Sequence, residues 1–93
     1  MFRAEFSDEA ATACWRTARR VLRHYGKRDA QGHTAVIFGS LVVTENNGGD
    51  VEVRRDQQLV LRVPLGLTPN RPVRWLPGDW VRDLERLACT IPS

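Results

Sequence analysis

The chain has 93 residues, which suits one domain, because a chain of this length buries only about two thirds of its unfolded surface. Its apolar fraction of 42% and charged fraction of 27% are ordinary for a globular protein and argue against a disordered, fibrous or membrane protein. The net charge is +3, and all the basic residues except Lys27 are arginine, which favours planar contacts with phosphate or carboxylate. We therefore expect residues 1–93 to form a single domain.

The sequence also predicts where the protein resides and how its thiols behave. No stretch approaches the roughly 18 apolar residues that span a bilayer, and the N-terminus lacks the apolar core of a signal peptide. We therefore expect no membrane contact and a cytoplasmic location. Cys14 and Cys89 are too few and too far apart for a disulfide framework or a zinc site, so both are predicted to be reduced and buried. No metal ion or cofactor is implied.

The first part of the chain predicts a helix. Residues 2–6 alternate apolar and charged side chains, as in a short edge strand or an extended lead-in. Ser7 is a good N-cap and Gly26 a good terminator, and apolar residues recur between them at three- and four-residue spacing. The recurrent positions are Ala11, Cys14, Trp15, Ala18, Val21, Leu22 and Tyr25. We expect a helix over residues 8–25 with a buried apolar stripe.

A polar connector, residues 27–31, leads into residues 34–44, which are rich in branched and aromatic side chains, as a strand would be. Gly39 and Ser40 interrupt this stretch. They form either a bulge in one long strand or a type II′ turn between two short ones. We favour the bulge, because a hairpin would place two wholly apolar strands against each other.

Asn47 and Gly48 are the strongest turn signal in the chain. With these two residues as the centre of a hairpin, Val42 faces Val53. The sheet face towards the helices is then predicted to carry Val42, Thr44, Val51, Val53, Leu61 and Val63. The reverse face would show an apolar patch of Ile37, Leu41, Val43 and Val60, bordered by Arg54 and Arg62. Such a patch, if uncovered, is an interaction site and offers a contact for a homodimer.

The register of the next hairpin is predicted from the requirement that apolar side chains lie on the same face of the sheet. A three-residue loop at residues 56–58 pairs Val51 with Val63 and Val53 with Leu61, whereas a two-residue loop would mix the two faces. We therefore expect the three-residue loop.

The last third of the chain combines a loop and a helix. Residues 64–78 contain four prolines and form a long loop that is either pinned over the sheet or part of a binding surface. Asp79 then caps a second helix. Its buried stripe is Trp80, Val81, Leu84, Leu87 and Ala88. The expected fold is α+β, with a three-stranded antiparallel sheet between two helices in the order α-β-β-β-α, with or without a short N-terminal edge strand.

The residues offer little for catalysis. The only histidines are His24 and His33, and no phosphate-binding glycine loop, nucleophile motif or spaced carboxylate pair accompanies them. We therefore expect no enzymatic activity. A metal-free ribonuclease is a weaker alternative, because Arg23, Tyr25 and Lys27 beside His24 are side chains that can stabilise charge on phosphate.

The clearest surface feature of the sequence is basic. Six of the fourteen basic residues fall within thirteen positions, mostly on the side of the first helix away from its apolar stripe. They are Arg16, Arg19, Arg20, Arg23, Lys27 and Arg28. Such a row is often only a solvated helix face, since cations favour the C-terminal half of a helix. The alternative is a binding site for an acidic protein surface or a nucleic-acid backbone.

The proline-rich loop is a second candidate, because tryptophan and arginine gather around it and are enriched at interface hot spots. Trp80 is predicted to close the end of the core, whereas Trp75 suits the core and a contact equally. The predicted binding residues are Arg16, Arg19, Arg20, Arg23, Lys27, Arg71, Arg74 and Trp75.

Two family resemblances are partial. The α-β-β-β-α order resembles that of double-stranded-RNA-binding domains, although Asp79 and Trp80 stand where that family has a lysine-rich helix start. The opening Phe-Arg-Ala-Glu-Phe-Ser-Asp-Glu-Ala at residues 2–10 is similar to the start of RelE-type ribonuclease toxins. We assign neither family. The leading hypothesis is a non-enzymatic, accessory or inhibitor-like module that binds a protein partner, and the alternative is sequence-nonspecific nucleic-acid binding through the first helix.

Overall fold

The computed structural model describes residues 9–46, 49–64 and 74–92. Their elements are α1 (Glu9–Tyr25), β1 (Lys27–Arg28), β2 (Thr34–Phe38), β3 (Leu41–Glu45), β4 (Val51–Arg55), β5 (Gln58–Val63), β6 (Arg74–Trp75) and α2 (Trp80–Cys89). The strand predicted at residues 2–6 and the cap predicted at Ser7 lie outside the described residues. Over the described ranges, neither helix has the length and apolar content that a membrane-spanning segment needs.

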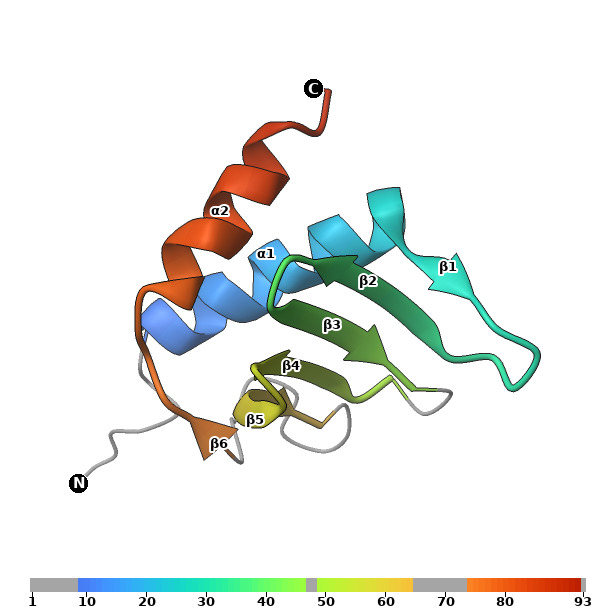
Figure 1. Cartoon of the computed structure of the whole chain (residues 1–93), viewed down its shortest axis with the longest axis horizontal. Helices are drawn as coiled ribbons and strands as arrows, with labels where there is room; N and C mark the ends of the chain where they lie inside the picture. Colours follow the sequence, from blue (N-terminus) through green and yellow to red (C-terminus); the bar gives the residue numbers. More distant parts are fainter. Residues whose placement is uncertain (1–8, 47–48, 65–73, 93) are drawn as a thin grey trace.

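The strands form one antiparallel sheet in which every strand pairs with its neighbours in sequence, from β1 to β6 (Figure 1). The α+β class is confirmed, but the prediction of three strands is wrong, because the sheet has six. Two of the additional strands, β1 and β6, have only two residues each, too few for an alternating pattern of their own. The third arises because residues 34–44 form two strands rather than one.

The connection between β2 and β3 is a tight turn and not the favoured bulge. Phe38 pairs with Leu41 across it, and Gly39 has a φ of 62°, as the first central position of a type II′ turn requires. The two apolar strands β2 and β3 can pair side by side because successive side chains in each strand point to opposite faces of the sheet. Val36 lies in the core, whereas Ile37 is exposed.

The register of β3 on β4 lies one residue from the prediction. Val43, rather than its neighbour, pairs with Val53. The N–H of Asn46 donates to the C=O of Asp50 and the N–H of Asp50 donates to Oδ1 of Asn46, both at 3.0 Å, so the loop is longer than two residues. The predicted turn centre, residues 47 and 48, lies outside the described residues.

This shift turns β3 over and removes the predicted apolar patch, because a slip of one residue exchanges the two faces of a strand. Leu41, Val43 and Val60 are buried, with exposed fractions of 1%, 1% and 5%. Ile37 is exposed at 75%, and Val42 lies beside it on the outer face. A homodimer through this face, still a prediction, would rest on these two side chains.

The register of β4 on β5 is as predicted, but its turn is not. Val53 pairs with Leu61, and the other predicted pair also forms. The chain turns on two residues, Asp56 and Gln57, and the register then shifts beside Val60. Because of this bulge, residues on the same face of the sheet still pair with each other across β4 and β5. The three-residue loop had been predicted for that same reason.

Both helices lie on one side of the sheet, so the sheet is not enclosed between them (Figure 1). The sequence leaves open whether a helix covers the second face. One buried cluster joins them to the inner face of the sheet. It consists of Cys14, Ala18, Val21 and Leu22 of α1, Val36, Leu41, Val43, Val51, Val53, Val60, Leu61 and Val63 of the strands, and Trp80, Leu84 and Ala88 of α2. At Gly26 a side chain would clash with the C=O of Leu22 and Cγ2 of Thr34, so glycine permits the end of α1 to approach β2 closely.

Candidate functional site

The side of α1 away from the sheet carries the predicted basic row. Arg16, Arg20 and Arg23 are exposed, and Arg19 is half-buried. Together with Trp15 these four arginines line a shallow hollow of about 240 Å³. We call this surface, formed by Trp15, Arg16, Arg19, Arg20 and Arg23, the arginine face.

The charge of the arginine face is not neutralised from within the described part of the chain. None of its four guanidinium groups forms an ion pair with another described residue. On the sheet, by contrast, Arg62 lies 3.6 Å from carboxylate oxygens of both Asp50 and Glu52, and Arg54 lies 2.5 Å from Glu52. Among the described residues, the arginines of α1 therefore have no carboxylate partner, whereas Arg54 and Arg62 do.

An aromatic ring borders this charge. The guanidinium carbon of Arg19 lies 5.3 Å from the ring centroid of Trp15, within the range of a cation–π contact. Trp15 also packs against the core, the role predicted for it, and is half-buried. Its second role was missed, although the spacing of four residues between Trp15 and Arg19 makes them neighbours on a helix.

The other predicted binding residues belong to other elements. Lys27 lies in β1 and Arg74 in β6, and both are exposed. Trp75 is half-buried and packs edge-on against Trp80, with ring centroids 5.9 Å apart. Arg71 lies outside the described residues. The structure therefore brings together four of the eight predicted residues, all from α1.

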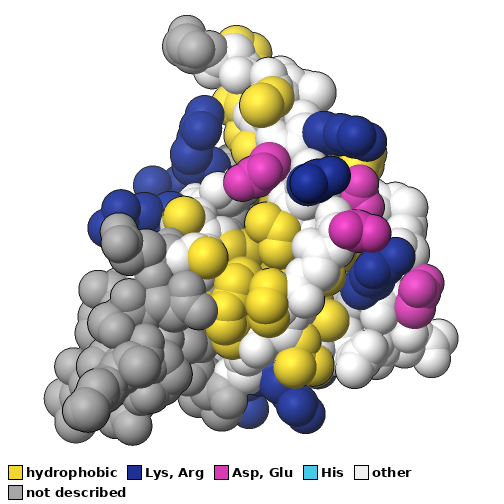
Figure 2. Space-filling view, turned by 90° about the vertical axis from the view of Figure 1, so that its left-hand side faces the viewer, with side chains coloured by type: hydrophobic (Ala, Val, Ile, Leu, Met, Phe, Trp, Pro, Cys, Tyr) yellow, Lys and Arg dark blue, Asp and Glu magenta, His cyan; other side chains and the backbone are white. Residues whose placement is uncertain are grey.

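The end of the molecule where α2 and β6 lie shows how charge and apolar surface are distributed. Hydrophobic side chains gather in the middle of this view, and a group of lysine and arginine side chains lies at its upper left (Figure 2).

Trp80 is 2% exposed, as predicted, and its Nε1–H donates to the C=O of Leu76 at 2.9 Å. Leu76 itself is 38% exposed.

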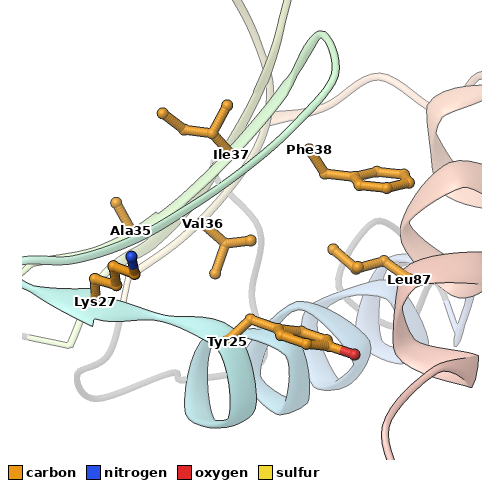
Figure 3. A pocket seen from close by; sticks show the side chains of 7 residues that line it. All are labelled: Tyr25, Lys27, Ala35, Val36, Ile37, Phe38 and Leu87. Atoms are coloured by element: carbon orange, nitrogen blue, oxygen red, sulfur yellow. The ribbon is translucent and has the colours of Figure 1, made fainter.

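A larger hollow, of about 480 Å³, lies between β2, α2 and the end of α1, and we call it the β2–α2 groove. It is lined by Tyr25, Lys27, Ala35, Val36, Ile37, Phe38 and Leu87. Val36 and Phe38 point from β2 into the groove, Leu87 faces them from α2, and Ile37 points away (Figure 3). The sequence did not indicate this groove, because it depends on how far α2 stands from β2.

The residues of the ribonuclease alternative are divided between two surfaces. Tyr25 and Lys27 line the β2–α2 groove, whereas Arg23 belongs to the arginine face. His24 is exposed and meets the ring of Tyr25 edge-on, with ring centroids 4.5 Å apart. In the described ranges, no three His, Cys, Asp or Glu side chains are placed to hold a metal ion.

A third hollow, of about 280 Å³, has the opposite charge and lies where β3 ends. It is lined by Asp29, His33, Thr34, Ala35, Thr44, Glu45, Asn46, Asp50 and Glu52. Arg62 is near two of its carboxylates, and Oδ1 of Asp29 accepts the N–H groups of Gln31 and His33 at 2.9 and 2.8 Å. Interactions within the chain therefore occupy several of these acidic groups.

The cysteines differ from the prediction in one respect. Both are free, and Cys14 is buried as predicted, but Cys89 is exposed. Cys89 follows the buried Ala88 in α2, so the turn of the helix carries it away from the core. Burial, with the carboxylate of Glu85 as the second cause, raises the pKa of the Cys14 thiol to about 12.

Comparison of the chain with protein-family models, curated proteins and solved structures finds no match. The case for a function therefore rests on the surfaces described above.

Proposed function

We propose that this chain is a non-enzymatic interaction module, of the accessory or inhibitor type, that binds an acidic protein surface through the arginine face. The observation that carries the proposal is the set of four arginines around one hollow, none of them in an ion pair with another described residue. Like charges held close together destabilise the folded state through repulsion. Carboxylates of a partner would relieve that repulsion.

The chemistry of the arginine face suits carboxylates that a protein presents. A guanidinium group binds a carboxylate through two parallel hydrogen bonds, which are stronger than hydrogen bonds between neutral groups. Trp15 adds an apolar wall whose ring is in contact with Arg19. Tryptophan and arginine are the side chains most enriched where binding energy concentrates in protein interfaces. The combination supports a partner surface that mixes acidic and apolar side chains.

A nucleic-acid backbone is the second candidate, and the same charges favour it. The row between Arg16 and Arg23 is about 10 Å long at 1.5 Å per helical residue. Nonspecific binders gain affinity by neutralising many phosphates along the strand. Lys27, which would extend the row, instead lines the β2–α2 groove. A short row with an aromatic border therefore favours a protein partner.

Two variants with the same change of charge test the proposal. The face variant carries Arg16→Gln, Arg19→Gln, Arg20→Gln and Arg23→Gln. The control variant carries Arg55→Gln, Arg74→Gln, Arg82→Gln and Arg86→Gln, at four exposed positions on other elements. Because both variants lose the same formal charge, a difference between them reports position rather than net charge.

Binding is measured by fluorescence anisotropy with two labelled probes, an acidic peptide of alternating glutamate and tyrosine and a mixed-sequence DNA duplex, at about 50 and 200 mM salt. We expect peptide binding to weaken at least about tenfold in the face variant, through loss of charge-assisted hydrogen bonds, and to change little in the control. Equal losses in both variants, or no binding of the peptide by the wild-type protein at low salt, would contradict the proposal. Tighter binding of the duplex, with a salt dependence that the face variant reduces, would establish the nucleic-acid alternative.

A further inference from the structure

The outer edge of β2 is only partly covered. β1 pairs with Thr34 and Ala35, and no strand among the described residues pairs with this edge at residues 36–38. Phe38 and Leu41 close a two-residue turn, so the N–H and C=O of Phe38 point towards β3. In an antiparallel ladder this direction alternates, and the N–H and C=O of Ile37 therefore point off the open edge. They form a donor and an acceptor ready for another strand.

The β2–α2 groove runs beside this open edge. Side chains of Val36 and Phe38 enter it from β2, and Leu87 closes it from α2 (Figure 3). The hydroxyl of Tyr25 is hydrogen-bonded to Oγ1 of Thr90 just beyond α2, which holds the phenol ring as a wall at the end of α1. The groove thus offers apolar walls on the same side of the sheet as the core.

The exposed side chains along the edge are apolar, and its end is basic. Ile37 and Phe38 are 75% and 43% exposed, the two most exposed large hydrophobic side chains of the described residues. Lys27 and Arg28 in β1 are also exposed, and neither forms an ion pair with a described residue. An exposed apolar strand edge is a template for pairing with another chain. The two cations favour acidic side chains in that chain.

We propose that the open edge of β2 binds an extended segment of a partner protein by strand addition. The backbone of the segment bonds to Ile37, its apolar side chains at alternate positions enter the β2–α2 groove, and an acidic side chain meets Lys27 or Arg28. This surface is separate from the arginine face, and the proposal does not depend on the function proposed above.

A second copy of the chain fits this edge less well than an extended segment does. β1 limits any added ladder to residues 36–38, whether it comes from a second copy or from an extended segment, so ladder length does not separate the two. Each copy, however, would bring Lys27 and Arg28 to the interface, without a carboxylate to receive them from the paired strand. Charge complementarity therefore favours an acidic segment.

The test is a nuclear magnetic resonance titration of the labelled full chain with a synthetic peptide of alternating valine and glutamate. The comparison peptide has the same sequence with N-methylated backbone amides, which cannot donate hydrogen bonds to a strand edge. We expect the unmodified peptide to shift the amide signals of residues 34–38 and of Leu87, and to slow hydrogen exchange at the N–H of Ile37. The methylated peptide should bind at least about tenfold more weakly.

Two substitutions on the protein side complete the test. Ile37→Pro removes the edge donor, and proline is tolerated on an edge strand whose N–H faces outwards. Ile37→Ala keeps the donor and is the matched control. We expect the proline variant to lose about as much affinity as the methylated peptide, and the alanine variant to lose little. If the proline variant does not fold, the two peptides still decide the question with the unaltered chain.

The face variant separates this proposal from the preceding one, since it should retain binding at the β2 edge. Equal affinity for both peptides, or shifts confined to α1 that vanish in the face variant, would overturn strand addition. A dimer in sedimentation analysis with the N–H of Ile37 already protected from exchange would also overturn it, because a second copy would then cover the edge.

Discussion

Cys14 and Cys89 are both free thiols, but they differ in exposure and acidity. Cys14 is 3% exposed on the inner side of α1, and burial raises its pKa from 9.0 to about 12. Its folded pKa lies above the unfolded value, so its contribution to stability is complete below pH 9 and is lost as the pH rises towards 12. The thiolate is the reactive form, and Cys14 is therefore inert at neutral pH.

We expect one thiol of the native protein to react with an aromatic disulfide reagent at mildly alkaline pH. Cys89 should react first, because it is exposed at the end of α2, and Cys14 should react only after denaturant unfolds the chain. Absorbance of the released thiol counts the reacting groups. In Cys89→Ser, a native reaction as fast as that of the wild-type protein would show that Cys14 is accessible.

The turn between β4 and β5 holds Asp56 and Gln57 in a left-handed conformation, which aspartate tolerates but glutamine disfavours. Asp56 and Gln57 have φ values of 50° and 71°, as both central positions of a type I′ turn require. Asparagine or aspartate followed by glycine is preferred there, because a left-handed conformation costs most other residues, including glutamine, roughly 1–2 kcal/mol. Both residues are exposed, so replacing them alters little packing.

Replacement of this pair with Asp56→Asn and Gln57→Gly is expected to raise the free energy of unfolding by about 1 kcal/mol. Urea denaturation followed by circular dichroism measures the change. Ser40→Gly in the turn between β2 and β3 is the control, since Ser40 does not have a positive φ and should lose a few tenths of a kcal/mol. A gain in the control as large as that in the double variant would contradict the explanation.

Among the elements, helices were more predictable from the sequence than strand registers. The stripe of α1 is unambiguous, because apolar and basic residues occupy opposite sides of the helix. In β3, by contrast, three consecutive residues are apolar, namely Leu41, Val42 and Val43. Either register of this strand therefore buries apolar side chains, Val42 in one and its two neighbours in the other. The longer loop that starts at Asn46 decides between the registers, and no alternation in β3 itself reveals it. The two-residue strands β1 and β6 are defined only by their backbone pairing with β2 and β5. Two residues carry no sequence pattern of their own, so both strands were missed.

The same reasoning explains which parts of the candidate surfaces were predictable. The four arginines of the arginine face are near in sequence and share a helix side, so spacing alone brings them together. The β2–α2 groove joins Tyr25, Phe38 and Leu87, which are remote in sequence and meet only in the tertiary structure. The open edge of β2 was hidden for another reason, because residues 34–44 were expected to form a single strand.

In the whole molecule, the attachment of α2 depends on a small set of buried side chains. The helix packs mainly on α1, and its buried residues are Trp80, Leu84 and Ala88. Trp80 joins the core at the start of α2, packs against Trp75 and donates a hydrogen bond to the C=O of Leu76. This one side chain therefore links α2 to β6 and to the sheet.

We expect Trp80→Ala to lower the free energy of unfolding by about 3–5 kcal/mol, the range for removal of a large buried aromatic side chain. Because one core joins both helices to the sheet, far-ultraviolet circular dichroism and the fluorescence of Trp15 and Trp75 should report coincident urea transitions at a lower midpoint. The face variant is the control, and its midpoint should change far less, since it removes surface repulsion together with the contact between Arg19 and Trp15. Loss of the helical signal at a lower urea concentration than that of the sheet would show instead that α2 unfolds as a separate unit.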